Sequence, residues 1–393
     1  MISEVILLDF SGHPFQIQLA RHLAAKEYKT HFLYSQDYIS GKGSFKTNEI
    51  GKKHLLIIPI HCKRELKKYN FFNRFLFEIE FSIRSAKIVN RINSKKIILC
   101  NVPIISLFLL NIFTRKKKII WHQDIYSIAI ASELNKNTNL LKKILTYIFI
   151  QMEKKILKDS EFIIGITEEF RKIYKFWQIP EDKIRIIENW APLDEIRSVP
   201  RSDNWLKSKG ITTNGLRLLY AGTLGRKHNP EHLISLMDHL RNLGRVASLT
   251  VISEGEGREI LECKTLERSD FLFFDFQPYE NMSEIFASHD ISLVLLEEDA
   301  SKYSVPSKVL SYVAAGKAVA GIIPNSNLAT EVIRKSAGMV GEPNLNGIKI
   351  LAKWISELSE KDIEKIGYQA RKYAELTFDI SLKADKFMEI LEK

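Results

Sequence analysis

The sequence predicts an α/β protein with two Rossmann-like domains that face each other across a cleft. Its 393 residues exceed the ~250 to 300 residues at which single cores usually divide. Short aliphatic runs alternate with longer amphipathic segments along the whole chain, which is typical of strand–helix–strand units with parallel sheets. The series of strands begins again after a polar, proline-containing segment at 190–204. Because ligands of such sheets bind beyond the carboxyl ends of the strands, we expect the site in the cleft.

The first half of the chain, residues 1–190, is the predicted N-terminal domain. A helix at 15–25 follows its first strand, and the predicted strands cover 5–10, 30–34, 55–60, 97–100, 118–121, 162–167 and 185–188. This half contains 32 Lys and Arg against 18 Asp and Glu, a net charge of +14. Such a basic half indicates an anionic partner, which is either a membrane surface or a nucleic acid.

Residues 191–375 are the predicted C-terminal domain. Its predicted strands cover 216–221, 249–253, 271–274, 291–296, 319–323 and 339–340. Residues 376–393 contain a last amphipathic helix, which we expect to pack back toward the N-terminal domain. From residue 191 onward the chain holds 26 basic and 29 acidic residues, so its basic character belongs to the first half.

Composition excludes several classes of protein. With 45% hydrophobic and 27% charged residues, the chain is neither disordered nor fibrous. The three cysteines lie far apart without a CxxC motif, which predicts a reducing compartment and neither a disulfide framework nor a zinc site. A basic leader and a run of ~20 apolar residues are both missing. We therefore expect a cytoplasmic protein without a transmembrane segment.

The loop at 222–229 is the strongest candidate for binding an anion. It follows a clear strand and leads into a helix, for which Asn229 is a good N-cap and Pro230 a good first residue. Its glycines allow close backbone approach, and Arg226 and Lys227 add two cations. This combination suits a phosphate or diphosphate. The alternative is an ordinary turn with two solvated cations.

Two further loops of the second half stand at strand ends. Ser307 and Lys308 open a helix and would offer a hydroxyl, backbone N–H groups and a cation to a phosphate. Glu297 and Glu298 directly follow the strand at 291–296, where carboxylates would bind sugar hydroxyls. The alternatives are a capped amphipathic helix with an exposed lysine and an ordinary acidic loop.

The first half offers two weaker candidates. Gly12 and His13 lie between the first strand and its helix, where backbone amides could meet a phosphate. His122 and Asp124 follow the strand at 118–121 and place an imidazole and a carboxylate at the expected cleft. A purely structural role for the histidine is the alternative. No set of residues has the spacing of a metal site.

Two other classes of protein remain as alternatives. An NAD-dependent oxidoreductase would also have Rossmann domains, but the segment at 254–258 has only the first two glycines of the dinucleotide fingerprint, and Ile260 stands at the third. A nucleic-acid-binding protein would use the basic N-terminal half. Its basic residues are scattered through helices and loops without a recognition motif.

Three segments of the second half resemble a known family. They are YAGTLGRKHNPEHLISL at 220–236, VISEGEGREILE at 251–262 and SVPSKVLSYVAAGKAVAGI at 304–322. The first half adds WHQD at 121–124 and the NW that ends the segment 161–190. Together with the order of elements, these motifs resemble the family 4 glycosyltransferases of the GT-B fold. The likeness is greatest to the bacterial branch that builds polysaccharide, such as the fucosaminyl and colanic-acid-type transferases.

The resemblance implies that the C-terminal domain binds a nucleotide sugar and the N-terminal domain an acceptor. The positions that would bind the donor are Gly12, Gly222, Gly225, Glu254, Gly255, Ser307 and Lys308, with Glu297 and Glu298 as further candidates. The positions implied in catalysis are Arg226, Lys227 and His122, and those on the acceptor side are His13 and Asp124.

Two departures from the family pattern concern the donor. Thr223 replaces the arginine that usually follows the first glycine of the phosphate loop, so its cations are reduced to Arg226 and Lys227. The usual pair of glutamates seven residues apart is replaced by Tyr303 and Ser311. Contacts to the ribose and the sugar therefore differ from the common pattern, which leaves open the donor and the anomeric outcome.

The resemblance implies a hexosyltransferase that moves a hexose or N-acetylhexosamine, with retention, from a nucleotide diphosphate sugar to a lipid-linked saccharide. A UDP-sugar is the favoured donor, and neither a cofactor nor a metal is expected. The product would be O-antigen of lipopolysaccharide, capsule or exopolysaccharide. The enzyme would be peripheral on the inner face of the plasma membrane.

The basic half suggests how such an enzyme would reach an anionic membrane. Its cations include Lys63, Arg64, Lys67, Lys68 and the run 115–118. Nearby apolar positions are Tyr69, Phe71, Phe72, Phe75, Leu76, Ile112 and Phe113. Basic residues attract anionic lipid and aromatic residues enter the interface. The alternative is a solvated basic face with its aromatics in the core.

Overall fold

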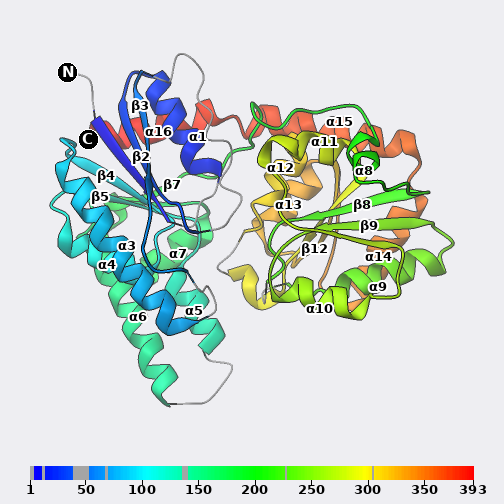
Figure 1. Ribbon diagram of the computed structural model, residues 1–393, viewed down its shortest axis with the longest axis horizontal. Coiled ribbons are helices and arrows are strands. Elements are labelled where there is room, and N and C mark those ends of the chain that lie inside the picture. Colours follow the sequence, from blue (N-terminus) through cyan, green and yellow to red (C-terminus); the bar gives the residue numbers. More distant parts are fainter. Residues whose placement is uncertain are drawn as a thin grey trace. The chain divides into compact units, whose positions relative to one another are not determined.

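The chain divides into two units, each built on one parallel sheet (Figure 1). The computed structural model describes residues 4–10, 14–38, 53–66, 70–134, 140–225, 228–302 and 305–393. Unit 1 comprises Met1–Asn189 and Ile380–Lys393, and unit 2 comprises Trp190–Asp379. The last segment of the chain therefore belongs to the same unit as its first strand.

Unit 1 contains a seven-stranded parallel sheet in the order β3-β2-β1-β4-β5-β6-β7. Its strands are β1 Glu4–Asp9, β2 Lys29–Ser35, β3 Leu55–Ile60, β4 Lys96–Cys100, β5 Lys117–His122, β6 Phe162–Gly165 and β7 Ile184–Ile186. Its α-helices are α1 Pro14–Ala25, α3 Phe71–Arg91, α4 Ile104–Phe113, α5 Tyr126–Leu134, α6 Leu140–Asp159, α7 Glu168–Phe176 and α16 Ile380–Glu392, with a 3-10 turn at Glu181–Lys183. All seven predicted strands are present.

Strand β6 ends two residues earlier than predicted because Thr167 is the N-cap of helix α7. The Thr167 side chain accepts a hydrogen bond from the Phe170 N–H at 3.3 Å, which caps α7. A threonine is compatible with a strand by pattern, and only its capping bond shows that the chain has already turned.

The C-terminal helix α16 closes the core of unit 1. Trp121 at the end of β5 is fully buried, and its ring lies 4.8 Å from that of Phe387. Lys96 donates a hydrogen bond to the Ile390 carbonyl at 3.2 Å, and Lys383 pairs with Glu188 at 3.0 Å.

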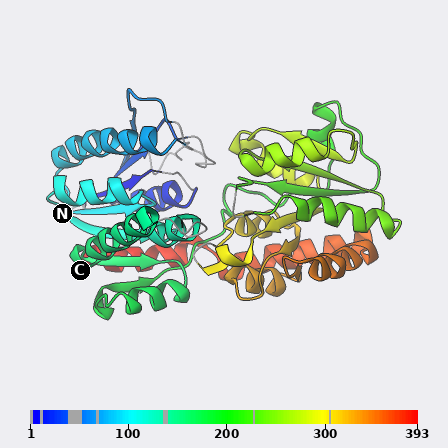
Figure 2. The same ribbon diagram turned by 90° about the horizontal axis from the view of Figure 1, so that it is seen from below.

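Unit 2 contains a six-stranded parallel sheet in the order β10-β9-β8-β11-β12-β13. Its strands are β8 Leu216–Ala221, β9 Ala247–Ile252, β10 Phe271–Phe274, β11 Ile291–Leu295, β12 Ala318–Ile322 and β13 Met339–Gly341. Its α-helices are α8 Asn204–Ser208, α9 Glu231–Asn242, α10 Glu256–Lys264, α11 Met282–Ala287, α12 Lys308–Ala314, α13 Leu328–Lys335, α14 Leu345–Glu357 and α15 Glu360–Thr377, with 3-10 turns at Tyr279–Asn281 and Glu298–Lys302. In each unit, helices cover both faces of the sheet (Figure 2). All six predicted strands are present here too.

The order of strands in unit 2 reverses between β8 and β11, and these two strands separate toward their carboxyl ends. Their register pairs only Leu218 with Ile291 and Leu219 with Ser292. Beyond that, the buried Tyr312 hydroxyl accepts a bond from the Ala221 N–H at 3.0 Å and donates one to the Ala221 carbonyl at 3.1 Å. A reversal of this kind opens the crevice in which open α/β sheets bind ligands.

No helix in the described part of the chain is both long and apolar enough to cross a lipid bilayer.

Candidate active site

The glycine loop of unit 2 begins at the carboxyl end of β8, where β8 and β11 separate. Gly222 has a φ of +125°, which an L side chain rarely adopts. A Cβ at this position would lie 3.1 Å from both Cε and Nζ of Lys308. The glycine therefore lets the Lys308 side chain lie directly against the loop. Two segments that the sequence proposed separately for phosphate binding are thus adjacent.

Lys308 is held in place by an aromatic ring. Its ammonium lies 3.7 Å from the centroid of the buried Tyr220 ring, within the range of a cation–π interaction. The Tyr220 hydroxyl donates a hydrogen bond to the Thr223 carbonyl at 3.0 Å, which fixes the ring. Ser307 immediately precedes α12 and does not cap it with its side chain. The arrangement places one oriented cation beside the glycine loop.

The turn at Glu254 and Gly255 is bonded to the same loop. The Leu224 N–H donates to the Glu254 carbonyl at 3.1 Å, and the Gly257 N–H donates to the Leu224 carbonyl at 2.9 Å. A Cβ on Gly257 would lie 2.7 Å from that carbonyl oxygen. Four predicted donor-binding positions, Gly222, Gly225, Glu254 and Gly255, therefore lie on two directly bonded loops.

Glu297 follows β11 and faces helix α9. Its Oε1 atom lies 3.0 Å from Nε2 of His232, while His228 Nδ1 accepts the Gly225 N–H at 3.2 Å. The two histidines thus have different partners. The described residues contain no group of three or more His, Cys, Asp or Glu that would hold a metal ion. Glu298 begins the following 3-10 turn and is exposed.

In unit 1, His122 lies at the end of β5 and is buried. Its Nδ1 atom lies 3.0 Å from the Tyr174 hydroxyl, and its Nε2 atom 3.6 Å from Oε1 of Glu153. Burial lowers the pKa of His122 to about 4, although the nearby charge of Asp124 opposes this. The imidazole is therefore neutral at pH 7, and both ring nitrogens face groups of unit 1. Its role near a transferred sugar stays a prediction.

Glu153, which sequence analysis missed, lies beside this histidine on helix α6. Its Oε2 atom accepts the Ser127 N–H at 3.0 Å at the start of α5. Burial raises the pKa of Glu153 to about 7, although its hydrogen bonds with Ser127 oppose this. One signal could have revealed it: the carboxylate shares a helical face with the buried Phe149, Ile156 and Leu157.

Four predicted site residues, Gly12, His13, Arg226 and Lys227, lie outside the described residues. Asp124 is half-buried just beyond β5. Gln123, between His122 and Asp124, exchanges two amide hydrogen bonds with Asn189, at 3.0 and 2.7 Å. This pair ties the WHQD segment to the NW segment within unit 1.

Residues 201–373 match the family model described as glycosyl transferases group 1. The chain is 22% identical over 329 residues to WbjE of Pseudomonas aeruginosa, named as a glycosyltransferase, covering 80% of this chain and 77% of that relative. It is 24% identical over 142 residues to WcaI of Escherichia coli, named for colanic acid biosynthesis, covering 35% of this chain and 34% of the relative.

Solved structures share the fold over the whole chain. WaaG, a glycosyltransferase involved in lipopolysaccharide biosynthesis, has a TM-score of 0.70 at 15% identity and covers 98% of this chain and 99% of its own. Anabaena HepE, solved with UDP and glucose, has a TM-score of 0.68 at 12% identity and covers 99% of both chains.

The two Rossmann-like units therefore have the GT-B fold. Within that fold class, residues 201–373 match the group 1 family, as the sequence predicted.

Proposed function

We propose that this glycosyltransferase moves a hexose or N-acetylhexosamine from a UDP-sugar to a hydroxyl of a lipid-linked saccharide in the synthesis of bacterial surface polysaccharide. The observation that carries the donor half is the ammonium of Lys308, fixed over Tyr220 beside Gly222. The names of WbjE, WcaI and WaaG support the pathway class, and HepE was solved with UDP-glucose.

Breaking the anomeric C–O bond leaves negative charge on the diphosphate and positive charge on the sugar ring. A preorganised cation at the diphosphate therefore stabilises the transition state more than the ground state. Lys308 is the described residue that supplies it, and Arg226 and Lys227 would add to it. In the proposed retaining reaction, the acceptor oxygen attacks from the leaving-group side. The departing phosphate oxygen takes the acceptor proton, so no protein base and no cofactor are needed.

The test begins with the donor. Stabilisation by a bound ligand follows RT ln(1 + [L]/Kd), so UDP, GDP and their sugars are screened for a rise in unfolding temperature. Lys308→Ala is then expected to lower kcat about 100-fold with the best donor, because it removes a transition-state stabiliser. Lys353→Ala, an exposed lysine on α14, is the matched control and should keep full turnover.

Three results would contradict the proposal. Full turnover of Lys308→Ala, together with an unchanged response to UDP, would mean that the glycine loop does not bind the diphosphate. Stabilisation by NAD with none by UDP or GDP would favour an oxidoreductase, and salt-sensitive DNA binding without sugar transfer would favour a nucleic-acid-binding protein.

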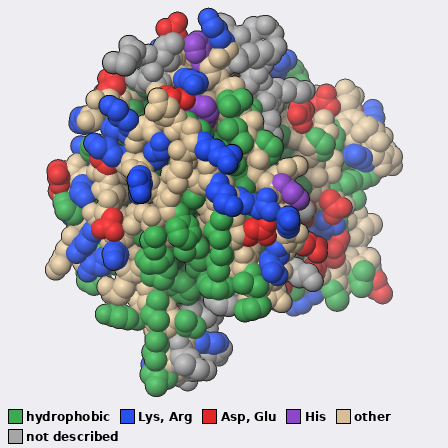
Figure 3. Space-filling view, turned by 60° about the vertical axis from the view of Figure 1, so that its left-hand side comes forward, with side chains coloured by type: hydrophobic (Ala, Val, Ile, Leu, Met, Phe, Trp, Pro, Cys, Tyr) green, Lys and Arg blue, Asp and Glu red, His purple; other side chains and the backbone are tan. Residues whose placement is uncertain are grey.

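The acceptor half of the proposal requires unit 1 to meet a membrane. Supporting residues on α3 and α4 are exposed: Phe72 and Phe75, and Ile112 and Phe113. The first half of α6, which sequence analysis did not single out, adds exposed apolar side chains, which gather on one face (Figure 3): Leu140, Ile144, Leu145, Tyr147 and Ile148. Contiguous apolar surface of this kind is typical of a binding face.

The predicted basic run at 115–118 fits this role less well than expected. Lys116 and Lys118 donate to the carbonyls of Ile92 at 2.7 Å and Thr114 at 2.9 Å, and Lys117 pairs with Glu161 at 2.8 Å. These cations already have partners inside unit 1, so replacing them would disturb the fold as well as any membrane contact.

A further inference from the structure

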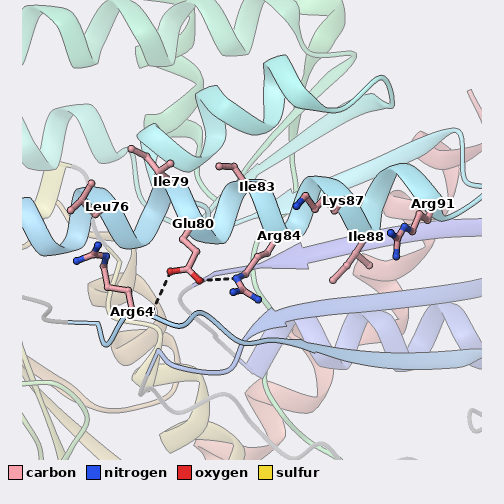
Figure 4. Close-up of a pocket in the computed structure, with 9 residues that line it drawn as sticks. All are labelled: Arg64, Leu76, Ile79, Glu80, Ile83, Arg84, Lys87, Ile88 and Arg91. Atoms are coloured by element: carbon pink, nitrogen blue, oxygen red, sulfur yellow. Dashed lines mark hydrogen bonds and ion pairs between the residues drawn. The ribbon is translucent and has the colours of Figure 1, made fainter.

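Helix α3 and the loop that follows β3 line a groove that combines cationic and aliphatic side chains (Figure 4). The groove has a volume of about 600 Å³ and runs beside the loop that follows β3. Its cations are Arg64, Arg84, Lys87 and Arg91, and its aliphatic side chains are Leu76, Ile79, Ile83 and Ile88. Neither the family match of residues 201–373 nor the glycine loop of unit 2 includes these residues.

The one carboxylate of the groove is already occupied. Glu80 accepts the Lys63 N–H at 2.7 Å and the Arg64 N–H at 3.3 Å, and it accepts a bond from Nε of Arg84 at 2.8 Å. Burial raises the pKa of Glu80, but these hydrogen bonds outweigh it and hold the pKa below its usual value. The carboxylate is therefore ionised, and it fastens the loop to the helix.

The other cations of the groove are Arg64, Lys87 and Arg91. Among the described residues, no acid pairs with their side chains. Lys87 and Arg91 are exposed and four residues apart, so they lie on one face of α3. The groove thus has an excess of positive charge at the end of the helix where Arg84, Lys87 and Arg91 stand.

The aliphatic side chains of the groove lie only partly in the core of unit 1, since Leu76, Ile79 and Ile88 are half-buried. A different face of α3 supplies Phe77 and Phe81, which are fully buried and contact Phe10 with ring distances of 6.1 and 4.9 Å. Ile83, on the groove face, is 40% exposed. From Leu76 to Ile88 the helix rises about 18 Å, comparable to the ~15 Å of one leaflet of a bilayer. The helix therefore has a second apolar face, interleaved with cations.

We propose that this groove binds an anionic phospholipid of the bilayer surface. Its phosphate would lie at Arg84, Lys87 and Arg91, because a guanidinium group can donate two parallel hydrogen bonds to two phosphate oxygens. An acyl chain would lie along Leu76, Ile79 and Ile83. A free phosphate would contact the cations alone and would leave the aliphatic side chains of the groove uncovered. The inference rests on one part of the proposed function, the lipid-linked acceptor, because lipid binding would bring unit 1 to that substrate.

The experiment compares the full-length protein with two double variants of equal charge. Lys87→Gln/Arg91→Gln removes two groove cations, and Lys172→Gln/Lys175→Gln removes two from α7. Binding is measured by co-sedimentation with vesicles of phosphatidylcholine, with and without about 30% phosphatidylglycerol, which supplies the anionic surface that basic residues bind. At ~1 kcal/mol for each cation near the surface, the groove variant should bind phosphatidylglycerol vesicles about 30-fold more weakly.

A soluble probe identifies the source of the phosphate. Dihexanoyl phosphatidylglycerol is expected to stabilise the native protein against heat, whereas inorganic phosphate and dihexanoyl phosphatidylcholine should not. Ile83→Ser is expected to lose most of this response while keeping its charge. An equal response to inorganic phosphate would overturn the acyl-chain part of the proposal. Equal loss of vesicle binding in both double variants would overturn the groove itself, as would dimerisation through this face without vesicle binding.

A separate readout keeps this inference apart from the proposed function. The groove variant should release UDP from the donor at the native rate in the absence of vesicles, since Lys87 and Arg91 have no part in the donor site. Conversely, Lys308→Ala should bind vesicles like the native protein. Loss of UDP release in the groove variant with an intact fold would overturn the assignment of these residues to lipid.

Discussion

His122 and Glu153 make opposite contributions to the pH dependence of folding. Burial lowers the pKa of His122 from 6.5 to about 4, so its stabilising effect is complete above pH 6.5 and is lost as pH falls through 4. Burial raises the pKa of Glu153 from 4.5 to about 7, so its effect is complete below pH 4.5 and is lost as pH rises through 7. The folded pair and the unfolded pair each hold about one proton between these limits. The two effects therefore nearly cancel.

Glu153→Gln is expected to reveal the contribution of His122 to the pH dependence of stability. The glutamine oxygen can still accept the Ser127 N–H, so the start of α5 keeps its partner. With the carboxyl gone, the free energy of unfolding should fall by about 2.5 kcal/mol between pH 7.5 and 4.5, because the unfolded histidine gains a proton that the buried one refuses. Over the same range the native pair should change this free energy by only about 0.3 kcal/mol.

The measurement is urea unfolding at pH 4.5, 5.5, 6.5 and 7.5. Unfolding of unit 1 is detected by the hydrogen exchange of peptides from that unit alone. This choice avoids mixing the transitions of two units. Glu169→Gln, on the exposed side of α7, serves as control and should parallel the native protein. If the Glu153→Gln profile also runs parallel to the native one, the two buried groups do not compensate each other and the reasoning fails.

Two further predictions concern unit 2 and the reaction. Tyr312→Phe should lower the stability of unit 2 by about 1 to 3 kcal/mol in urea unfolding, because it leaves the buried N–H and carbonyl of Ala221 without their partner; a loss below the error of measurement would mean that water replaces the hydroxyl. Sugar transfer should persist in excess EDTA, because Lys308 supplies the cation beside the glycine loop; inactivation by EDTA that Mn²⁺ reverses would show that a metal is required.

The strands were predictable because parallel strands covered on both faces appear in the sequence as short aliphatic runs. Residues 97–100 in β4 are a clear example, since all four are buried. The adjacency of the two candidate phosphate-binding loops was predictable for a related reason. Gly222 follows one strand and Lys308 opens a helix, and the carboxyl ends of parallel strands meet at one edge of the sheet.

The contacts that sequence analysis missed are between residues far apart in the chain. Tyr174 and Glu153 meet His122 from two different helices, and no local pattern specifies which helix packs over the end of β5. The basic run at 115–118 offers fewer solvated cations than its sequence indicates, and here the reason is local. Charge counts treat every lysine as solvated, whereas Lys116 and Lys118 reach backbone carbonyls nearby.

The return of α16 to unit 1 sets an order for synthesis on the ribosome. Unit 2 lies within the chain between the two segments of unit 1, so Ile380–Lys393 emerges only after all of unit 2. Until then Trp121 lacks the covering ring of Phe387. Although domains generally fold from the N-terminus onward during translation, here the later unit can complete its core first. A message truncated after codon 379 would yield a finished unit 2 joined to a first unit with an open apolar face, which is a substrate for chaperones and proteases.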